Sequence, residues 1–504
     1  MSQTASLIDI APAGFRHGPM PCRTVSIPQW EQAALDLAEG TVELMSLWAA
    51  EAAVHMALRD GTTGNFAILR LDCPSGNFPS VGRRHAPAQR LERTVHDLHG
   101  LAPTDAPDGR PWLDHGRWLI RHPLGMAKPS SGTPGEYAFL PTEGRSLHRV
   151  PVGPVHAGII EPGHFRFTAQ GETVVRLEER LGYVHKGIDT LMSGADIARG
   201  CELAGRTSGD STVAYAWAYA QAVEAAFRVT VPERALWLRA VAAELERLAN
   251  HLGDIGAICN DAAFGLLHTH CAVLRERVLR TAETCFGHRM VRDYIVPGGV
   301  AVDLEVEGVS ELHELLALIG ATFPSIAEVY DYTPSLKDRT VLTGHLKPDL
   351  ANRFAAGGFV GRASGRDFDT RRDAAYAPYD RLSFDVPVLH SGDVNARVWV
   401  RILEVEQSLS LLAQCLDQLP VGAFRTEVVA DGAAREGLGL VEGFRGDILV
   451  WLALDADARI TRCHIRDPSW FQWPLLEAVI EDNIIADFPL CNKSFNCSYS
   501  GHDM

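Results

Sequence analysis

The sequence has no C-x-x-C pair, although the chain has 504 residues and 10 cysteines. Such pairs are the commonest signature of zinc, iron–sulfur and thiol redox sites, so their absence argues against all three. Ten cysteines in a chain of this length are also too few for a disulfide scaffold. We therefore expect the cysteines to be reduced and mostly buried, as small apolar side chains.

Positive charge is also scarce, with a net charge of −16 at pH 7. Proteins that bind nucleic acid usually carry a basic field, so no nucleic-acid partner is expected. No run approaches about 18 consecutive apolar residues, which predicts no transmembrane helix. The first residues, MSQTASLIDIAPAGF, lack the basic segment and apolar run of a secretory signal. These absences predict a cytoplasmic protein.

The passage HPLGMAKPSSGTPGEY at 122–137 is rich in proline, glycine and serine and predicts a linker. We accordingly expect a small N-terminal α+β domain at 1–122, a linker at 123–150 and a larger domain at 151–504. In the small domain, NFAILRLD at 65–72 predicts a strand, and the apolar spacing at 86–101 predicts a helix.

The larger part has long helical patterns between strand-like segments. Strands are expected at 163–181, with a Gln-Gly turn, and as a pair at 447–467. Helices are expected at 212–227, 230–256, 266–290 and 473–484. For the second helix, Thr230 is the expected cap, with Pro232 in the first turn. The fold class is α+β: a small α+β domain followed by a large, mainly helical bundle with flanking small β-sheets.

Three motifs carry candidate chemistry. ELERLANHLGD at 244–254 places Glu244, Arg247, His251 and Asp254 on successive helical turns, without the order of a zinc-protease motif. Its residues form either an interhelical polar network or a path for protons. GRTSGDS at 205–211 matches no phosphate-binding loop, and GRASGRDFDTRRD at 361–373 is typical of a solvated basic loop. Taken singly, none of the three assigns a function.

In their order along the chain, these motifs resemble a known family. The larger part resembles the large subunit of group 4 nickel–iron hydrogenases and, equally, the 49-kDa subunit of complex I. The matching text is GPVHAGIIEPGHFRF, RLGYVHKGID, ELERLANHLGDIG, GRASGRDFD, EGFRGDILVWL and IRDPSWFQWPLL. The smaller part resembles the 30-kDa subunit of complex I through ERTVHDLHGLAP and RPWLDHGRW. Among these relatives, the energy-converting hydrogenase-related complexes without nickel ligands fit best.

The resemblance implies where nickel ligands would stand. In the hydrogenases two C-x-x-C pairs hold the metal centre, and their positions here align with Ser208, Ser211, Ser498 and Gly501. A serine hydroxyl is a harder and far less acidic ligand than a thiol, and glycine offers no ligand. We therefore expect no metal bound by this chain, and we expect the tail LCNKSFNCSYSGHDM to be the remnant of a metal site.

The resemblance also implies a site. In complex I the vacated cavity binds a quinone headgroup through a histidine, matched by His156, and a tyrosine, for which Tyr215 is the nearest substitute. Glu161 and His164 are candidates for proton transfer, since such groups can exchange protons near neutral pH. Arg445 is the candidate for stabilising an anionic intermediate or for pairing with Glu442. The expected cavity residues are Arg206, Ser208, Asp210, Ser211, Tyr215, His251 and Ser498.

Three functions stay open at this point. The chain is a subunit that reduces a quinone or another substrate without nickel, a non-catalytic scaffold that transmits conformational change, or a divergent hydrogenase. Each implies a hetero-oligomeric complex with a small iron–sulfur subunit that supplies electrons, and with antiporter-like membrane subunits for any ion translocation. The chain would then lie peripherally on the inner face of the cell membrane.

Overall fold

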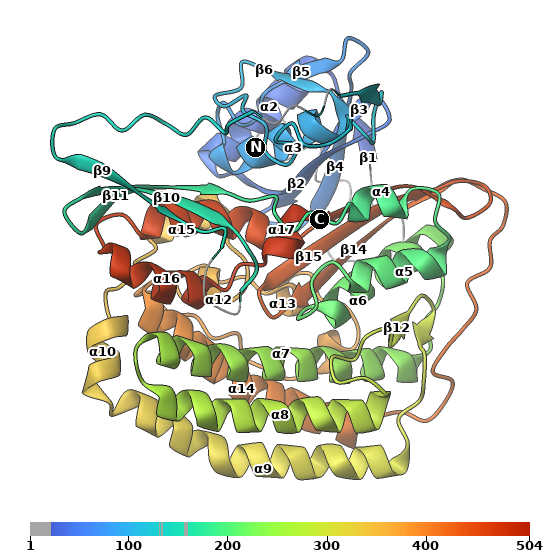
Figure 1. Ribbon diagram of the computed structural model, residues 1–504. Coiled ribbons are helices and arrows are strands. Elements are labelled where there is room, and N and C mark those ends of the chain that lie inside the picture. Colours follow the sequence, from blue (N-terminus) through green and yellow to red (C-terminus); the bar gives the residue numbers. More distant parts are fainter. Residues whose placement is uncertain (1–21, 131, 133–134, 156–159) are drawn as a thin grey trace.

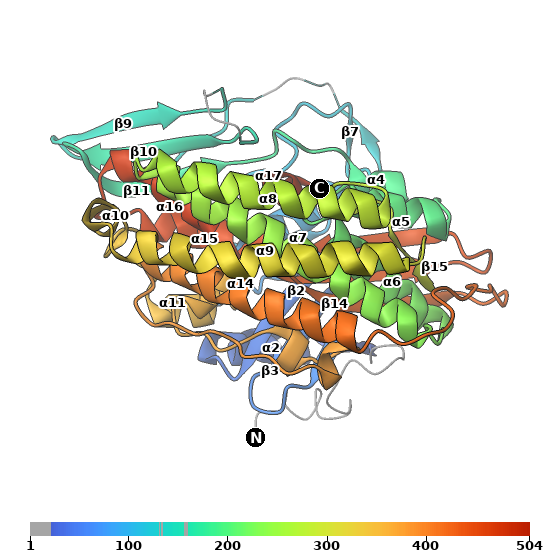
Figure 2. The same ribbon diagram turned by 90° about the horizontal axis from the view of Figure 1, so that it is seen from below.

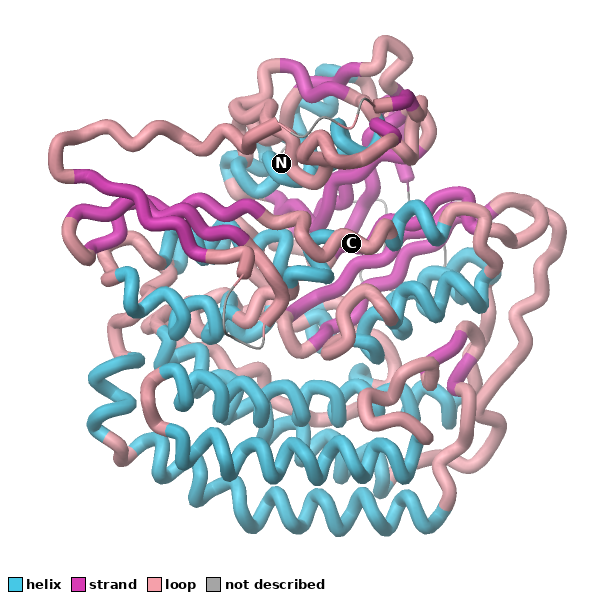
Figure 3. Tube along the Cα trace, viewed as in Figure 1, coloured by secondary structure: helices cyan, strands magenta, loops and turns pink. Residues whose placement is uncertain are grey.

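The computed structural model describes residues 22–130, 132, 135–155 and 160–504. His156 therefore lies outside the described residues. The architecture confirms the predicted α+β class: the described residues form a small N-terminal sheet, a helical bundle, two three-stranded sheets and three two-stranded ones (Figure 1). Colouring by secondary structure shows the long helices gathered on one side and the strands on the other (Figure 3).

The N-terminal part is a four-stranded sheet with two helices. The sheet order is β1-β4-β3-β2. The bounds are β1 Cys22–Thr24, β2 Val42–Ala50, β3 Ala53–Asp60, β4 Phe66–Asp72, α2 Ile27–Glu39 and α3 Gln89–His99. The predicted strand at 65–72 is confirmed by β4, and the predicted helix at 86–101 by α3, after a single 3-10 turn at Ala86–Ala88.

The bundle consists of long helices in layers. The bounds are α6 Thr212–Phe227, α7 Glu233–Asp261, α8 Gly265–Phe286, α9 Val306–Asp331 and α14 Val394–Asp417. Helix α7 packs on both α8 and α14, and α9 covers the outside of α8 (Figures 1 and 2). The predicted cap of α7 is wrong, because the helix begins at Glu233 with Pro232 at the N-cap and no side-chain cap.

The outermost helix, α9, alters the membrane prediction. Among the described residues it is the one helix long and apolar enough to cross a membrane, with 28% of its apolar window buried. The sequence predicted no such helix because no uninterrupted apolar run is long enough. Helix α9 qualifies instead by its mean hydropathy of 1.3, which tolerates a few polar residues. A core helix of a soluble protein meets the same criterion, and α9 buries Leu312, Ile319 and Phe323 within the bundle.

Two three-stranded sheets complete the larger part. They have the orders β11-β10-β9 and β14-β15-β16. The bounds are β9 Leu147–Val152, β10 His164–Gln170, β11 Thr173–Arg180, β14 Arg435–Gly443, β15 Gly446–Leu454 and β16 Ile460–Arg466. Both predicted strand pairs are confirmed. Strand β14 lies so close to α6 that a Cβ atom at Gly437 or Gly439 would collide with backbone carbonyls of that helix.

The N-terminal sheet packs on the β14–β16 sheet through a buried apolar cluster. Met45, Trp48 and Ile68 lie against Leu449 and Trp451 there. The Trp48 indole stacks on His464 with ring centroids 4.9 Å apart. The two parts of the chain therefore share a buried interface with an apolar cluster.

The C-terminal segment is more helical than predicted. The helix expected at 473–484 is α15 Ser469–Val479, and the tail adds α16 Phe488–Phe495 and α17 Tyr499–Asp503. The remaining elements are short: β5 Asn77–Pro79, β6 Ala102–Thr104, β7 Ile120–Arg121, β8 Lys128–Pro129, α4 Ile188–Met192, α5 Ile197–Gly205, β12 Ile295–Val296, β13 Gly299–Val300, α10 Pro334–Thr340, α11 Pro348–Arg353, α12 Gly358–Arg362 and α13 Thr370–Asp373.

Candidate functional site

The loop between α5 and α6, which we call the serine loop (207–211), lies next to the C-terminal tail. Its Ser208 hydroxyl donates to Asp210 at 2.8 Å. The Ser208 and Ser498 hydroxyl oxygens are 3.0 Å apart and share a hydrogen bond. Ser498 also caps α17 by accepting from the Gly501 amide at 2.9 Å. Two segments far apart in sequence thus meet where the resemblance places metal ligands.

Arg445 clamps the serine loop to the tail. It lies at the tip of the β14–β15 hairpin, and its guanidinium donates to both carboxylate oxygens of Asp210, at 2.8 and 2.5 Å. The same side chain donates to the Ser211 hydroxyl at 3.1 Å and to the Asn496 carbonyl at 2.5 Å. Burial opposes ionisation of Asp210, but the charge of Arg445 outweighs it and lowers the pKa of that carboxyl.

A polar cavity of about 690 Å³ lies beside this clamp. The volume is within the range of small-molecule sites. Its wall includes the predicted Glu161, Ser208, Asp210, Arg445 and Ser498. Further wall residues, which were not among the expected cavity residues, are Asn250, His268, Arg275, Lys493, Asn496, Tyr499 and Ser500. The remaining lining residues include Asp254, Cys497 and several small side chains.

The four positions where the family would carry thiolates do not suit a nickel–iron centre. Two of them, Ser208 and Ser498, are hydrogen-bonded directly to each other. A Cβ atom on Gly501 would lie 2.6 Å from the Tyr215 hydroxyl and 2.7 Å from an Asp467 carboxylate oxygen. Among the described residues, no group of three or more His, Cys, Asp and Glu side chains is arranged to hold a metal ion. We therefore assign no step to a metal here.

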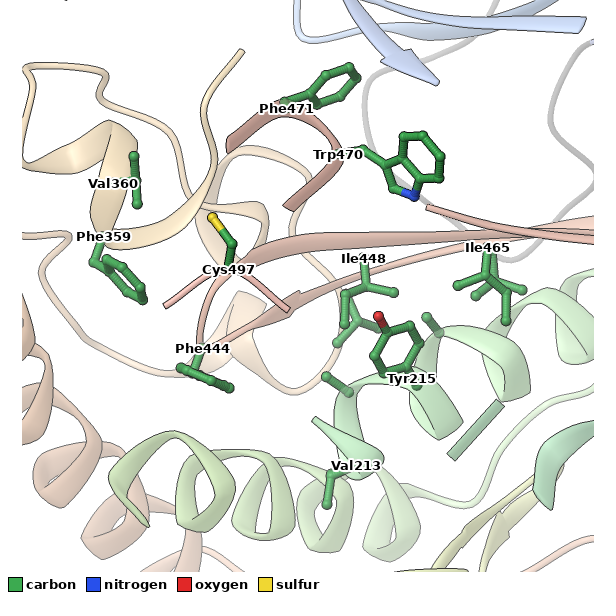
Figure 4. Close-up of a cluster of buried hydrophobic side chains, with 14 of the residues drawn as sticks. Val213, Tyr215, Phe359, Val360, Phe444, Ile448, Ile465, Trp470, Phe471 and Cys497 are labelled. Carbon is green, nitrogen blue, oxygen red and sulfur yellow. The ribbon is translucent and has the colours of Figure 1, made fainter. Parts of the chain in front are cut away.

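Tyr215 is not on the cavity wall. Its hydroxyl donates to Asp467, and its ring is fully buried at the start of α6. Figure 4 shows the ring between Val213 and Ile448, in the apolar cluster between α6 and the β14–β16 sheet. Burial and the nearby Asp467 charge raise the pKa of this phenol well above its ordinary value. The side chain fills the space that a fourth ligand would need.

His251 also lies elsewhere, in a buried ion-pair network between α7, α14 and the 361–373 loop. Its Nε2 atom is 2.6 Å from Glu404, which in turn pairs with Arg362 at 2.5 Å. Burial lowers the pKa of His251, although Glu404 opposes that effect. Glu244 belongs to the same network through Arg371 at 3.0 Å. Glu244, Arg247 and His251 of the 244–254 motif therefore lie in an interhelical network, which was one of the two interpretations of the motif.

The same network positions the hairpin that carries Arg445. Arg247 donates to the Gly443 carbonyl at 3.0 Å and to the Glu442 carbonyl at 2.8 Å. The Glu442 carboxylate pairs with Arg362 at 3.1 Å, whereas the Arg445 guanidinium pairs with Asp210. The alternative that Arg445 pairs with Glu442 is therefore wrong, because each of the two side chains has a different partner.

The other predicted residues are divided between bracing and surface positions. His164 uses Nδ1 toward the Gly153 carbonyl, at 3.0 Å, and Nε2 toward Arg166, at 3.3 Å. Arg206 is partly exposed and pairs with Asp293 at 2.7 Å, away from the cavity wall. Glu161 does lie on the wall, where its carboxylate accepts from the Ser500 amide at 2.9 Å.

Comparisons with known proteins agree with this fold. A family model described as the 49 Kd subunit of respiratory-chain NADH dehydrogenase matches residues 266–432. Formate hydrogenlyase subunit 5 of Escherichia coli is 32% identical over 448 residues, which are 86% of this chain and 78% of that protein. Hydrogenase-4 component G of the same organism is 32% identical over 467 residues, covering 90% and 80%.

A third relative comes from the other branch of the resemblance. An NADH-quinone oxidoreductase subunit of Dehalococcoides mccartyi is 32% identical over 345 residues, which are 67% of this chain and 92% of that protein. The relatives are subunits or components of oxidoreductases by their names. The chain is therefore an oxidoreductase-type subunit and belongs to the family of large subunits shared by group 4 hydrogenases and complex I.

Proposed function

We propose that the chain is the large subunit of a membrane-bound, complex I-like or hydrogenase-4-like oxidoreductase, and that it reduces a substrate inside the polar cavity without nickel. In this proposal the electrons come from a small iron–sulfur subunit, because no cluster-ligand set occurs among the described residues. Antiporter-like membrane subunits carry any ion translocation, and the chain lies peripherally on the inner face of the membrane. Relatives called subunits and components support membership of such a complex.

A single observation carries this proposal: a polar cavity persists where the thiolate positions are serines and glycine. The Ser208–Ser498 hydrogen bond closes the ligand positions, yet about 690 Å³ of space remains beside them. Hydroxyl, amide and ammonium groups on the wall can donate to carbonyl oxygens of an acceptor. A quinone headgroup is one such acceptor. Tyr215 cannot hold it in the present arrangement, because its hydroxyl is bonded to Asp467.

A scaffold function is the second candidate, and the Arg445 clamp favours it. The guanidinium already donates to Asp210, Ser211 and the Asn496 carbonyl, and these bonds brace the serine loop against the tail. A scaffold would need this brace but no substrate.

The first experiment is elemental analysis of the complex purified with its native partners. We expect iron that the partner's clusters account for, and no nickel. Nickel near one atom per chain, with hydrogen-dependent dye reduction, would establish the divergent hydrogenase instead.

The second experiment separates the substrate-reducing subunit from the scaffold. The clusters of the purified complex are reduced chemically, and their reoxidation by a short-chain quinone is followed by electron paramagnetic resonance. Asp210→Asn should slow reoxidation at least about tenfold, because it removes the carboxylate that holds the Arg445 guanidinium beside the cavity, where its positive charge would stabilise an acceptor that gains electrons. Asp293→Asn, on the surface pair with Arg206, is the matched control. Equal rates in both variants would favour the scaffold.

A further inference from the structure

Helix α7 carries two glutamates whose surroundings differ sharply. Glu244 is fully buried and accepts hydrogen bonds from Arg371, Tyr379 and Ser408. Glu246, on another face of the same helix, has no ion pair with any described residue. Its two carboxyl oxygens accept from backbone amides at the start of α6, Val213 at 2.7 Å and Ala214 at 3.1 Å.

Without a cation, the Glu246 carboxyl can hold a proton at neutral pH. Burial raises its pKa to about 8, which the two amides and Arg247 partly offset and the Asp210 charge reinforces. A protonated carboxyl keeps lone pairs that accept hydrogen bonds from the two amides, and it gains one O–H donor. The group is thus suited to both take and give a proton.

A second, smaller cavity places this carboxyl next to the large one. The small cavity has a volume of about 20 Å³ and is lined by Glu246, Asn250, Arg275, Arg289 and apolar side chains. Its volume is enough for one water molecule, and Glu246, Asn250 and Arg275 offer that water polar partners on a wall that is otherwise mostly apolar. Asn250 and Arg275 also line the large cavity, so the two cavities share a wall.

The residues shared by the two cavities, Asn250 and Arg275, are polar, and one of their hydrogen-bonding groups has no partner among the described residues. The Asn250 amide donates to the Asp210 carbonyl at 2.7 Å, which ties it to the serine loop. The Nε atom of Arg275 is buried without a hydrogen-bond partner among the described residues, so a water molecule beside it has a donor to accept from. On the far side, the Arg289 side chain is 42% exposed and opens toward solvent.

We propose that Glu246 carries protons between solvent near Arg289 and the large cavity, through a water molecule in the small cavity. This inference rests on the proposed function, because reduction of an organic acceptor by two electrons takes up two protons. The iron–sulfur partner supplies the electrons and bulk water the protons. In each transfer the Glu246 carboxyl gives its proton toward the acceptor, becomes a carboxylate and is reprotonated from the solvent side.

The first test measures the titration of Glu246 without any turnover. The carboxyl has a pKa of about 8 in the folded chain and about 4.3 when unfolded. The folded state therefore holds a proton that the unfolded state releases, and the contribution of Glu246 to the Tm should fall as pH rises from about 5 to about 8. Asp210, Arg247, Arg275 and Arg289 are the charged groups facing this site.

Variants isolate the contribution of this one group. In the assembled complex, the Tm of Glu246→Gln should depend less on pH than that of the wild type. The Tm of the variant relative to wild type should therefore rise as the pH approaches 8. Glu314→Gln, an exposed position on α9, is the matched control and should follow wild type. Parallel profiles for Glu246→Gln and wild type would overturn the inference, whatever the variant's absolute stability.

The second test measures transfer itself, as cluster reoxidation by the short-chain quinone in H₂O and D₂O. Glu246→Gln should slow reoxidation at least about tenfold and enlarge the solvent isotope effect, while Glu246→Asp should recover part of the rate. Unchanged rates with a normal wild-type reaction would refute proton carriage. No quinone reaction in the wild type would instead count against the proposed function and leave the titration result standing.

Discussion

Helix α7 has two contrasting sides. On the side that faces α14 and the 361–373 loop, buried charges meet opposite charges. On the side that faces α6 and α8, neither Glu246 nor Arg275 has an ion pair among the described residues. The Arg362 guanidinium pairs with three carboxylates, those of Glu404, Asp369 and Glu442, at distances of 2.5 to 3.2 Å. The first side fixes the Arg445 hairpin through Arg247. The contrast shows one helix serving as a rigid support on one face and as the wall of two cavities on another.

The largest effect should come from breaking the paired side. Arg362→Met leaves three buried carboxylates without their shared cation, and we expect it to lower the free energy of unfolding by about 3–5 kcal/mol. Arg372→Met is the control, since that side chain is 39% exposed and its pairs are worth about 0–1 kcal/mol. Denaturant unfolding of the two variants measures the difference. Similar losses would mean that the network does not stabilise the fold as described.

The next effect concerns the crowded ligand position. Gly501→Ala should cost about 1–3 kcal/mol, because its methyl group would meet the Tyr215 hydroxyl and Asp467. In a Tyr215→Phe background the same change should cost less, since the hydroxyl is gone. A double-mutant cycle measures this coupling. Additive costs would show that Tyr215 does not fill the ligand position.

A third effect appears on acidification and lies away from α7. Burial, with help from Arg70 and Arg462, lowers the pKa of His55 to about 4, against about 6.5 when unfolded. The unfolded chain then binds more protons, so stability should be lost as pH falls from about 6.5 to about 4, by on the order of 2–3 kcal/mol. This direction is opposite to that for Glu246.

Variants at two histidines test the acid effect. His55→Gln should reduce the loss measured by urea unfolding between pH 7 and pH 4.5. The exposed His313→Gln should not change it. An equal pH dependence in both variants would assign the loss to other groups.

The smallest effect is expected at Arg206. Its pair with Asp293 is partly exposed and should contribute at most about 1 kcal/mol. Arg206→Gln should also leave cluster reoxidation unchanged, because the side chain lies outside the cavity wall. A clear loss of reoxidation rate would show that Arg206 contributes to the cavity site after all.

The sequence predicted elements better than it predicted the site. Helix α7 and strand β4 were predicted from local sequence patterns, and both elements form close to the expected residues. Glu246 could not be distinguished from Glu244, because only the tertiary structure determines which one meets an arginine. The placement of Tyr215 depends likewise on Asp467, which a different segment supplies.

The wall residues on α8 and in the tail were missed for a related reason. Arg275 and Lys493 have no local pattern that separates them from surface cations. Asn250 and Asp254 did lie within the 244–254 motif, and their helical spacing from Glu246 and His251 was the one available signal. Contacts between distant segments decide which of these faces the cavity.

The Ser208–Ser498 hydrogen bond joins positions 290 residues apart. During synthesis the serine loop, α5 and α6 leave the ribosome long before Ser498 does, because the chain emerges from its N-terminus. The cavity consequently stays open on one side until α16 and α17 are made and seated. A chaperone or an assembly partner that recognised the unclosed wall could tell a finished subunit from a nascent one.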